Sequence, residues 1–282
     1  MSVATIPCRS PEYPSALSDL GDAPKVLWAL GDRGALHDPV VAIVGTRRAT
    51  NYGLRMAREI AGALARAGAC VVSGMALGID GAAHRGALDA GGKTVAILGT
   101  GVDVPYPRAH LALYREIVEQ GLVLSEMPAG ARSHGGSFPN RNRLIAALAR
   151  LVIVIEAPIK SGALGTAEHG LNLGRDIAVV PGPIDSPQSA GSNNLLRNGA
   201  HPIVSVDDAV MLAGLSPRPK ARPRVDDEVE VRVWAALEKG AASLDELCAR
   251  ASLPVAQCLA AVTGLELRGA IECALTGEIR RR

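Results

Sequence analysis

The sequence predicts an α/β protein with a doubly wound, mostly parallel sheet, followed by a small C-terminal winged-helix domain. Between residues 40 and 205, short apolar runs rich in β-branched residues alternate with helical segments, as in parallel sheets covered on both faces. After residue 225 the chain instead holds three short helical segments and a hairpin pattern. That second pattern is typical of a winged helix-turn-helix.

Each strand of the predicted sheet is a nearly continuous apolar run. The predicted strands cover residues 40–45, 70–74, 94–99, 122–126, 151–157, 176–182 and 201–205. Segment 53–68, between the first two, carries apolar residues at helical spacing and should bury one stripe against the sheet. In an open sheet of this kind, ligands gather at the carboxyl ends of the strands.

Composition shifts divide the chain into four parts. Residues 1–36 are predicted to form an N-terminal extension packed on the core, and residues 37–215 the α/β domain. Residues 216–225 hold prolines and four basic residues without an apolar pattern, which predicts a semi-rigid linker. Residues 226–282 form the predicted winged-helix domain.

The overall composition is that of a globular chain. Of 282 residues, 48% are hydrophobic and 21% charged, so a buried core is expected and wholesale disorder is excluded. No apolar run approaches the roughly 18 residues that span a bilayer, and the N-terminus lacks the pattern of a secretory signal. The five cysteines include no CxxC pair, which argues against a disulfide framework or a zinc site and favours a cytoplasmic location.

The formal net charge of +2 is unevenly distributed. No acidic residue occurs between Glu126 and Glu156, whereas four arginines do. Residues 226–282 carry seven basic and ten acidic residues, a net charge of −3. Because a face that reads duplex DNA should be basic, a protein-contact or regulatory role for the winged helix is as well supported as DNA binding.

The turn after the first core strand is a candidate anion site. It reads Gly45-Thr46-Arg47-Arg48 and leads into a helix. A glycine lets the backbone approach a ligand, a hydroxyl adds a donor, and a helix N-terminus favours an anion. Arg47 supplies a forked phosphate donor. The alternative is a tight turn with surface arginines.

The second core strand ends in Ser73-Gly74, which begins a segment running to Asp80. Ser73 and Gly74 either form another anion-binding nest or only close the turn into the next helix. Asp80 and His84 lie four residues apart on that helix and could form an acid–base pair. A helix cap and a packed histidine explain the same two residues without any chemistry.

The strongest local signal is Phe138-Pro139-Asn140-Arg141-Asn142-Arg143, which contains the only phenylalanine of the chain. Two arginines and two asparagines can hold successive phosphates while the ring stacks on a base. The alternative is that Phe138 anchors the start of a basic helix. A glycine-rich turn beginning at Ser161-Gly162 also opens a helix, where another phosphate would bind.

Two common nucleotide-binding motifs are missing. Gly92-Lys93-Thr94 lacks the Walker glycine because residue 87 is alanine, and Gly45 is followed by no glycine before Gly53. ATPase and NAD-dependent dehydrogenase functions are therefore excluded. Paired carboxylates lie outside the strand-end turns, so the sequence predicts no metal site, no catalytic residues and no cofactor.

Together these motifs resemble the DNA-processing protein A (DprA) family, also called Smf. The matching pieces, in family order, are Val44-Gly45-Thr46-Arg47, Ser73–Asp80 with Ala83-His84, Tyr106-Pro107, Phe138–Arg143, Glu156 with Ser161–Leu164, and Pro181-Gly182. They extend over about residues 11–212. The resemblance implies an extended Rossmann-like domain joined to a winged helix.

The resemblance implies a non-enzymatic recombination mediator that binds single-stranded DNA without reading its sequence. Family members protect incoming DNA during natural transformation, load the RecA recombinase onto it, and usually form homodimers through the Rossmann domain. The nucleic-acid-binding residues that the resemblance assigns are Gly45, Thr46, Arg47, Ser73, Gly74, Phe138, Asn140, Arg141, Asn142, Arg143, Ser161 and Gly162. Some members have a basic residue where Leu77 stands, so a phosphate contact there would be lost or shifted onto Arg48 or Lys160.

The alternative function is a nucleotide-processing enzyme on a related Rossmann fold. The phosphoribohydrolases of that group carry the motif PGGxGTxxE. Here Thr166 and Glu168 are separated by one residue where the motif has two. On a helix, this slip turns the carboxylate by about 100° away from the site.

Overall fold

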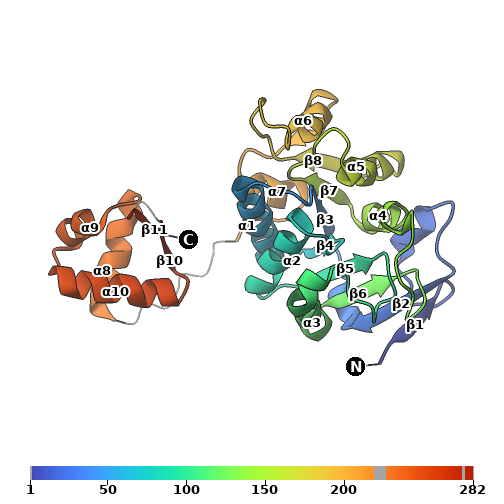
Figure 1. Ribbon diagram of the computed structural model, residues 1–282, viewed down its shortest axis with the longest axis horizontal. Helices are drawn as coiled ribbons and strands as arrows, with labels where there is room; N and C mark the ends of the chain where they lie inside the picture. The colour runs from blue at the N-terminus through green and yellow to red at the C-terminus, as the bar shows by residue number, and fades with distance from the viewer. Residues whose placement is uncertain (1, 219–226, 275–276, 282) are drawn as a thin grey trace. The chain divides into compact units, whose positions relative to one another are not determined.

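The computed structural model describes residues 2–218, 227–274 and 277–281. The chain divides into two compact units, Met1–Arg218 and Pro219–Arg282 (Figure 1). Residues 216–218 of the predicted linker end the first unit, and its residues 219–225 lie outside the described residues.

The first unit is built on one nine-stranded sheet. Its strands are β1 (Ala4–Pro7), β2 (Val26–Gly31), β3 (Val40–Val44), β4 (Cys70–Ser73), β5 (Thr94–Leu98), β6 (Leu122–Ser125), β7 (Leu151–Val154), β8 (Asp176–Val179) and β9 (His201–Pro202). Their order is β1-β2-β6-β5-β4-β3-β7-β8-β9, and every pair is parallel except β1–β2 and β2–β6. Each of the seven predicted strands is present, so the predicted α/β class is confirmed.

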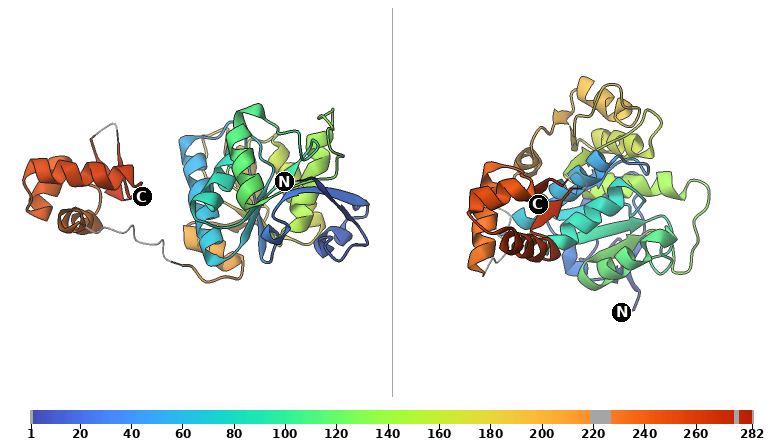
Figure 2. Two further views of the ribbon diagram at one scale, coloured as in Figure 1. Left: turned by 90° about the horizontal axis from the view of Figure 1, so that it is seen from below. Right: turned by 60° about the vertical axis from the view of Figure 1, so that its left-hand side comes forward.

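Helices cover both faces of the sheet (Figure 2). The helices of this unit are α1 (Asn51–Ala67), α2 (Ile79–Asp89), α3 (Leu111–Gln120), α4 (Ser137–Leu148), α5 (Gly162–Asn172), α6 (Ala190–Arg197) and α7 (Val206–Leu212). Along β3, Ile43 joins the core beneath α1, α2 and α7, whereas Ala42 and Val44 join the core beneath α4 and α5. This double burial is why β3 is apolar at every position.

The chain reverses its direction of travel across the sheet at β3. The segment from β3 to β6 moves toward one edge, and β7, β8 and β9 are then added on the other side of β3. The carboxyl ends of β3 and β7 are therefore neighbours from which the chain departs in opposite directions. Such a switch point is where open α/β sheets bind ligands.

Residues 1–36, predicted as an N-terminal extension packed on the core, contribute two edge strands to the sheet. β1 pairs with β2, and β2 pairs in turn with β6, placing Trp28 opposite Ser125. The inward side chains of this hairpin, Ile6 and Leu27, are buried. Both pairings are antiparallel, so this edge differs from the parallel centre of the sheet.

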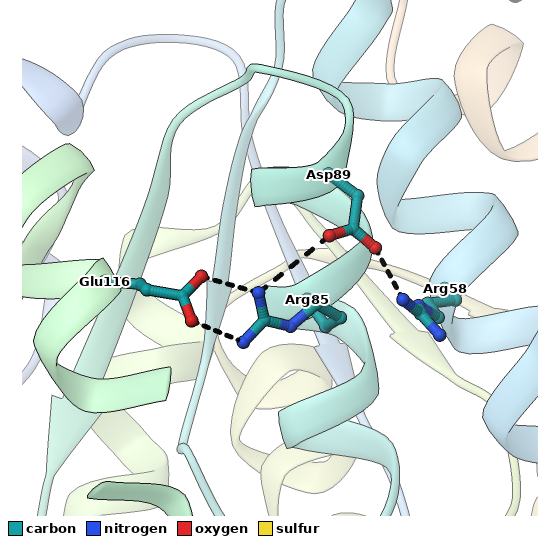
Figure 3. A network of polar contacts seen from close by, with 4 residues as sticks. All are labelled: Arg58, Arg85, Asp89 and Glu116. Carbon is teal, nitrogen blue, oxygen red and sulfur yellow. Dashed lines mark hydrogen bonds and ion pairs between the residues drawn. The ribbon is translucent and has the colours of Figure 1, made fainter. Parts of the chain in front are cut away.

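Helices α1 and α2 pack very closely. A Cβ atom on Gly86 of α2 would overlap the carbonyl oxygen of Arg58 in α1. Around this contact, Arg58 pairs with Asp89 at 2.7 Å and Arg85 pairs with Glu116 of α3 at 2.5 Å (Figure 3). All four side chains are partly exposed, so we expect each pair to contribute at most about 1 kcal/mol.

The second unit is a winged helix, as predicted. Its elements are α8 (Glu228–Ala236), α9 (Leu244–Ala251), α10 (Val255–Leu267), β10 (Ile271–Cys273) and β11 (Ile279–Arg281). Val233, Leu247 and Leu265 belong to a core of its own, and β10 and β11 form the antiparallel wing. Within the described residues, no single helix is long and apolar enough to cross a membrane, and only α9 and α10 together, bent by 107°, pass that test.

Candidate functional site

A cavity of about 380 Å³ opens at the switch point between β3 and β7. Its walls are the turn after β3, the start of α4 and the start of α5. The lining residues are Val44, Gly45, Thr46, Arg47, Arg48, Ala76, Asp80, Phe138, Pro139, Arg141, Asn142, Ile145, Pro158, Lys160, Ser161, Gly162, Ala163 and Thr166. Eight of the twelve predicted nucleic-acid-binding residues are in this set; Ser73, Gly74, Asn140 and Arg143 are not.

The turn after β3 is held against the neighbouring β7 segment. The Thr46 N–H donates to the Glu156 carbonyl at 2.7 Å, and the Thr46 hydroxyl accepts from the Arg48 N–H at 3.2 Å. Gly45 has no room for a side chain, because a Cβ atom would lie 2.5 Å from Ile79. The glycine therefore lets the backbone pass between two elements, and the turn is fixed by its own hydrogen bonds.

Glu156 anchors the far end of this turn, a role that the sequence did not reveal. Its carboxylate is only 2% exposed and accepts hydrogen bonds from both the N–H and the hydroxyl of Thr50. Thr50 caps α1 by accepting from the Gly53 N–H at 3.1 Å. A Cβ atom on Gly53 would overlap the Glu156 carboxylate. The sequence feature that could have indicated this role is an acidic residue at the end of an otherwise apolar strand.

Arg47 is exposed and is held by an aromatic side chain. Its guanidinium carbon lies 5.4 Å from the centre of the Phe138 ring, within the range of a cation–π contact. This contact places a forked donor at the edge of the cavity. Exposed Arg48 and Lys160 line the same cavity. Its accessible charge is therefore positive.

Arg141 lies beneath the cavity, where it is only 4% exposed. Its Nη1 donates to the carbonyl of Gly74 at 2.7 Å and to that of Ile97. The guanidinium fills the space in which Gly74 would carry a side chain. Burial lowers the pKa of Arg141 to about 10, so the group stays charged at neutral pH. The structure thus uses Arg141 to join the ends of β4 and β5.

Asp80 is a buried carboxylate whose charge interacts with that of Arg141. It accepts from the backbone N–H groups of Gly74 at 3.2 Å and Ala76 at 3.3 Å. Burial raises the pKa of Asp80, and the Arg141 charge opposes that rise. The carboxylate therefore organises the turn after β4.

His84 has a separate environment from Asp80. Its Nδ1 is 2.7 Å from the Thr94 hydroxyl, and burial lowers its pKa to about 3, so the ring is neutral. Asp80 lines the cavity and His84 does not. The geometry supports the packed histidine that the sequence offered as the alternative to an acid–base pair. Asp80 does not cap α2, because its carboxylate accepts from Gly74 and Ala76, which precede the helix, and no side-chain hydrogen bond caps α2 at Gly78.

Arg143 points away from the main cavity. It pairs with Glu126 at 2.6 Å and with Asp22 at 3.0 Å, and its side chain is 14% exposed. Together with Asn140, it lines a second cavity of about 520 Å³. The arginine-rich stretch without acids therefore loses much of its expected positive charge, because Glu126 and Asp22 come from other parts of the chain.

The remaining predicted residues support the walls. The Ser73 hydroxyl is buried and donates to the Ile43 carbonyl at 2.6 Å. Ser161 caps α5 by accepting from the Ala163 N–H, and the Asn142 amide donates to the Gly162 carbonyl at 3.1 Å. The N-terminus of α5 thus faces the cavity, where its backbone dipole favours an anion. Leu77 is 43% exposed and is not part of the lining.

Fold and site define a class: a Rossmann-type α/β protein whose switch-point cavity is suited to anions, joined to a winged helix. No group of three or more potential metal ligands occurs in the described part of the chain. Residues 4–214 match the family described as DNA recombination-mediator protein A, and residues 200–274 match the DprA winged helix domain. The chain belongs to the DNA recombination-mediator protein A (DprA/Smf) family.

Relatives of known sequence and structure agree with this assignment. The chain is 46% identical over 265 residues to a putative DNA processing protein DprA of Mycobacterium tuberculosis, covering 90% of this chain and 68% of that protein. The structure of DprA from Streptococcus pneumoniae aligns with a TM-score of 0.71 and 39% identity, over 75% of this chain and 74% of the other. DprA from Helicobacter pylori, described for its single-stranded DNA binding mode, aligns with a TM-score of 0.68 and 35% identity, over 74% and 94%.

Proposed function

We propose that this protein binds single-stranded DNA in the switch-point cavity and acts as a non-enzymatic recombination mediator. The observation that carries the proposal is the cavity itself, where Arg47, Arg48 and Lys160 are exposed beside the N-terminus of α5. Each supplies donors for phosphate. The Helicobacter pylori relative, described for binding single-stranded DNA, supports the same ligand.

Within this proposal, nine of the predicted nucleic-acid-binding residues fall into three groups. Gly45, Thr46, Arg47, Asn142 and Gly162 lie on the surface or backbone of the cavity and contact the DNA. Buried Arg141 and Ser73, whose polar groups are used on backbone carbonyls, hold the strand ends in position. Arg143 and Asn140 face the second cavity and are secondary to binding.

We also propose the wider role that the family resemblance implies: protection of incoming DNA during natural transformation and loading of the RecA recombinase, in the cytoplasm, by a homodimer. Val204, two residues after the edge strand β9, and Met211 of α7 are exposed apolar residues of the Rossmann unit, and such residues suit contact with a second copy. The alternative phosphoribohydrolase function lacks support at its key residue, because Glu168 is exposed and outside the cavity lining.

The mediator role is tested by adding the protein to an oligonucleotide already coated with a single-strand-binding protein and measuring recombinase filament formation. The proposal predicts faster filament formation with the wild-type chain and a smaller acceleration with Arg47→Ala at the same sub-saturating protein concentration. Equal rates with and without the wild-type protein would refute recombinase loading. Release of free base from a nucleoside monophosphate would instead revive the enzymatic alternative.

A further inference from the structure

Phe138, the ring that the sequence marks for base stacking, already has close neighbours. The Arg47 guanidinium lies over it, and the Tyr106 ring packs against it with centroids 5.0 Å apart and planes tilted by 32°. A Cβ atom on Gly99, at the end of β5, would be only 3.1 Å from Phe138 Cδ1. Phe138 is thus only partly exposed and acts as the middle member of a row that runs from Arg47 to Tyr106.

Tyr106 is the exposed end of this row. Its residue surface is 44% accessible, and it is the only one of the seven aromatic residues, all within the described chain, that is classed as exposed. Tyr106 lies in the loop between β5 and α3 and outside the lining of the switch-point cavity. An accessible ring next to a cationic cavity is how sequence-tolerant proteins hold the bases of a single strand.

The charges around Tyr106 suit the same ligand. Arg108, two residues along the chain, is exposed and makes no ion pair within the described residues. The one carboxylate close by in sequence, Asp103, accepts a hydrogen bond from the Gly130 N–H at 2.7 Å. The loop that carries Tyr106 therefore also carries an exposed cation, Arg108, that could contact a phosphate of the same strand.

We propose that Tyr106 is a base-stacking subsite: a nucleobase of the bound single strand stacks on its exposed ring, while Phe138 serves as a spacer that orients both Tyr106 and Arg47. This inference rests on the proposed binding of single-stranded DNA in the cavity. It extends the binding surface across the end of β5. It also assigns the two ends of the row different partners, a phosphate for Arg47 and a base for Tyr106.

The test compares Tyr106→Leu, which keeps an apolar side chain without a π face, with Tyr106→Phe, which keeps the ring. Binding of labelled oligothymidylate is measured by fluorescence anisotropy over a salt series. Stacking on one base corresponds to roughly a 5- to 150-fold change in Kd. We expect a loss in that range for Tyr106→Leu and nearly wild-type affinity for Tyr106→Phe. Leu111→Ala, an exposed apolar truncation in the same region, is the matched control and should bind normally.

The salt series and a second probe separate a base contact from a phosphate contact. Because Tyr106 touches no phosphate, the slope of log Kd against log salt should be unchanged in Tyr106→Leu. The second probe is an oligomer of abasic deoxyribose phosphates, which has the charges of DNA but no bases. Wild type should lose more affinity on this probe than Tyr106→Leu does, because the variant has already lost the base contact.

Each outcome decides one claim. Wild-type affinity in Tyr106→Leu, or equal losses of both proteins on the abasic probe, would overturn the subsite and leave the proposed function intact, provided that Arg47→Ala still weakens binding. Failure of the wild-type chain to bind oligothymidylate at low salt would overturn the proposed function and the subsite together.

Discussion

Replacement of Arg47 by alanine isolates the phosphate contact on which the proposed function depends. The residue is exposed, lines the cavity and lies over the Phe138 ring. Its side chain is not part of the buried core. We therefore expect the variant to fold normally. Its midpoint of thermal unfolding should equal that of the wild-type chain.

The size of the effect follows from the exposure of Arg47. A hydrogen bond to a charged group contributes about 1.5–3 kcal/mol, and partial screening at an exposed site reduces this to about 1–2 kcal/mol. That range corresponds to roughly a 5- to 30-fold rise in Kd. Loss of one phosphate contact should also make the salt slope shallower by about 0.7, the value for a single strand.

Fluorescence anisotropy with a labelled single-stranded oligonucleotide, repeated at several salt concentrations, measures both quantities. Arg115→Ala is the matched control, because Arg115 is an exposed residue of α3 outside the cavity. It removes the same charge from the same unit. A salt line for Arg47→Ala parallel to that of wild type, or an equal change of slope in Arg115→Ala, would refute the assignment of Arg47 to a phosphate.

Three further predictions concern residues that act through the fold. Arg141→Lys should lower the free energy of unfolding by about 2–4 kcal/mol, because the buried guanidinium donates hydrogen bonds to two backbone carbonyls. A free energy of unfolding equal to that of wild type would show that Arg141 is not needed to hold the ends of β4 and β5. Glu156→Gln should weaken the hydrogen bonds that Thr50 donates to residue 156 and so make the turn after β3 less rigid. We expect the Kd for single-stranded DNA to rise about 5- to 10-fold, and unchanged affinity in anisotropy titrations would contradict this. His84 binds a proton more readily in the unfolded chain, because its pKa in the folded protein is lowered to about 3. The free energy of unfolding should therefore fall as pH drops from about 6.5 toward 3. Urea unfolding at pH 7 and pH 5 should show a smaller fall of that free energy in His84→Gln than in wild type, and equal falls would exclude His84 as the cause.

A truncation after Val225, which keeps the basic linker, tests the winged helix, whose unit has its own core. Helix α10 contains no lysine or arginine. Arg268, Arg280 and Arg281 are paired with glutamates of the same unit. The truncated chain should therefore keep the wild-type affinity and salt slope for single-stranded DNA. A shallower slope after truncation would show that the winged helix contacts phosphates.

The sequence was sufficient for the central sheet because β3 and its parallel neighbours are buried on both faces, and only continuous apolar runs satisfy that environment. It was insufficient for β1 and β2, which are short edge strands with mixed burial and look like an irregular extension. The turn after β3, which the sequence marks as a candidate anion site, lies in the cavity lining. Glycine and the start of a helix are the local signatures that drew attention to it.

The roles of the arginines could not be predicted from their spacing. Arg141 and Arg143 are two residues apart, yet one is buried against carbonyls and the other is paired with Glu126 and Asp22. Asp22 is distant in sequence, and Glu126 lies just before the acid-free stretch, so a count of charges within that stretch overestimates the positive charge of the site. Phe138 was likewise expected to meet a base, and its two neighbours in the row, Arg47 and Tyr106, come from other loops.

The most direct test of the central claim is the preference of the wild-type chain for single-stranded over duplex DNA. Anisotropy titrations with labelled oligonucleotides of equal length, over a salt series, measure this preference without any variant. We predict clearly tighter binding of the single strand and a steep decline of its affinity with salt, because the proposed mode places several phosphates against the cavity. Equal affinity for both forms, or no binding at low salt, would contradict the assignment of this cavity to single-stranded DNA.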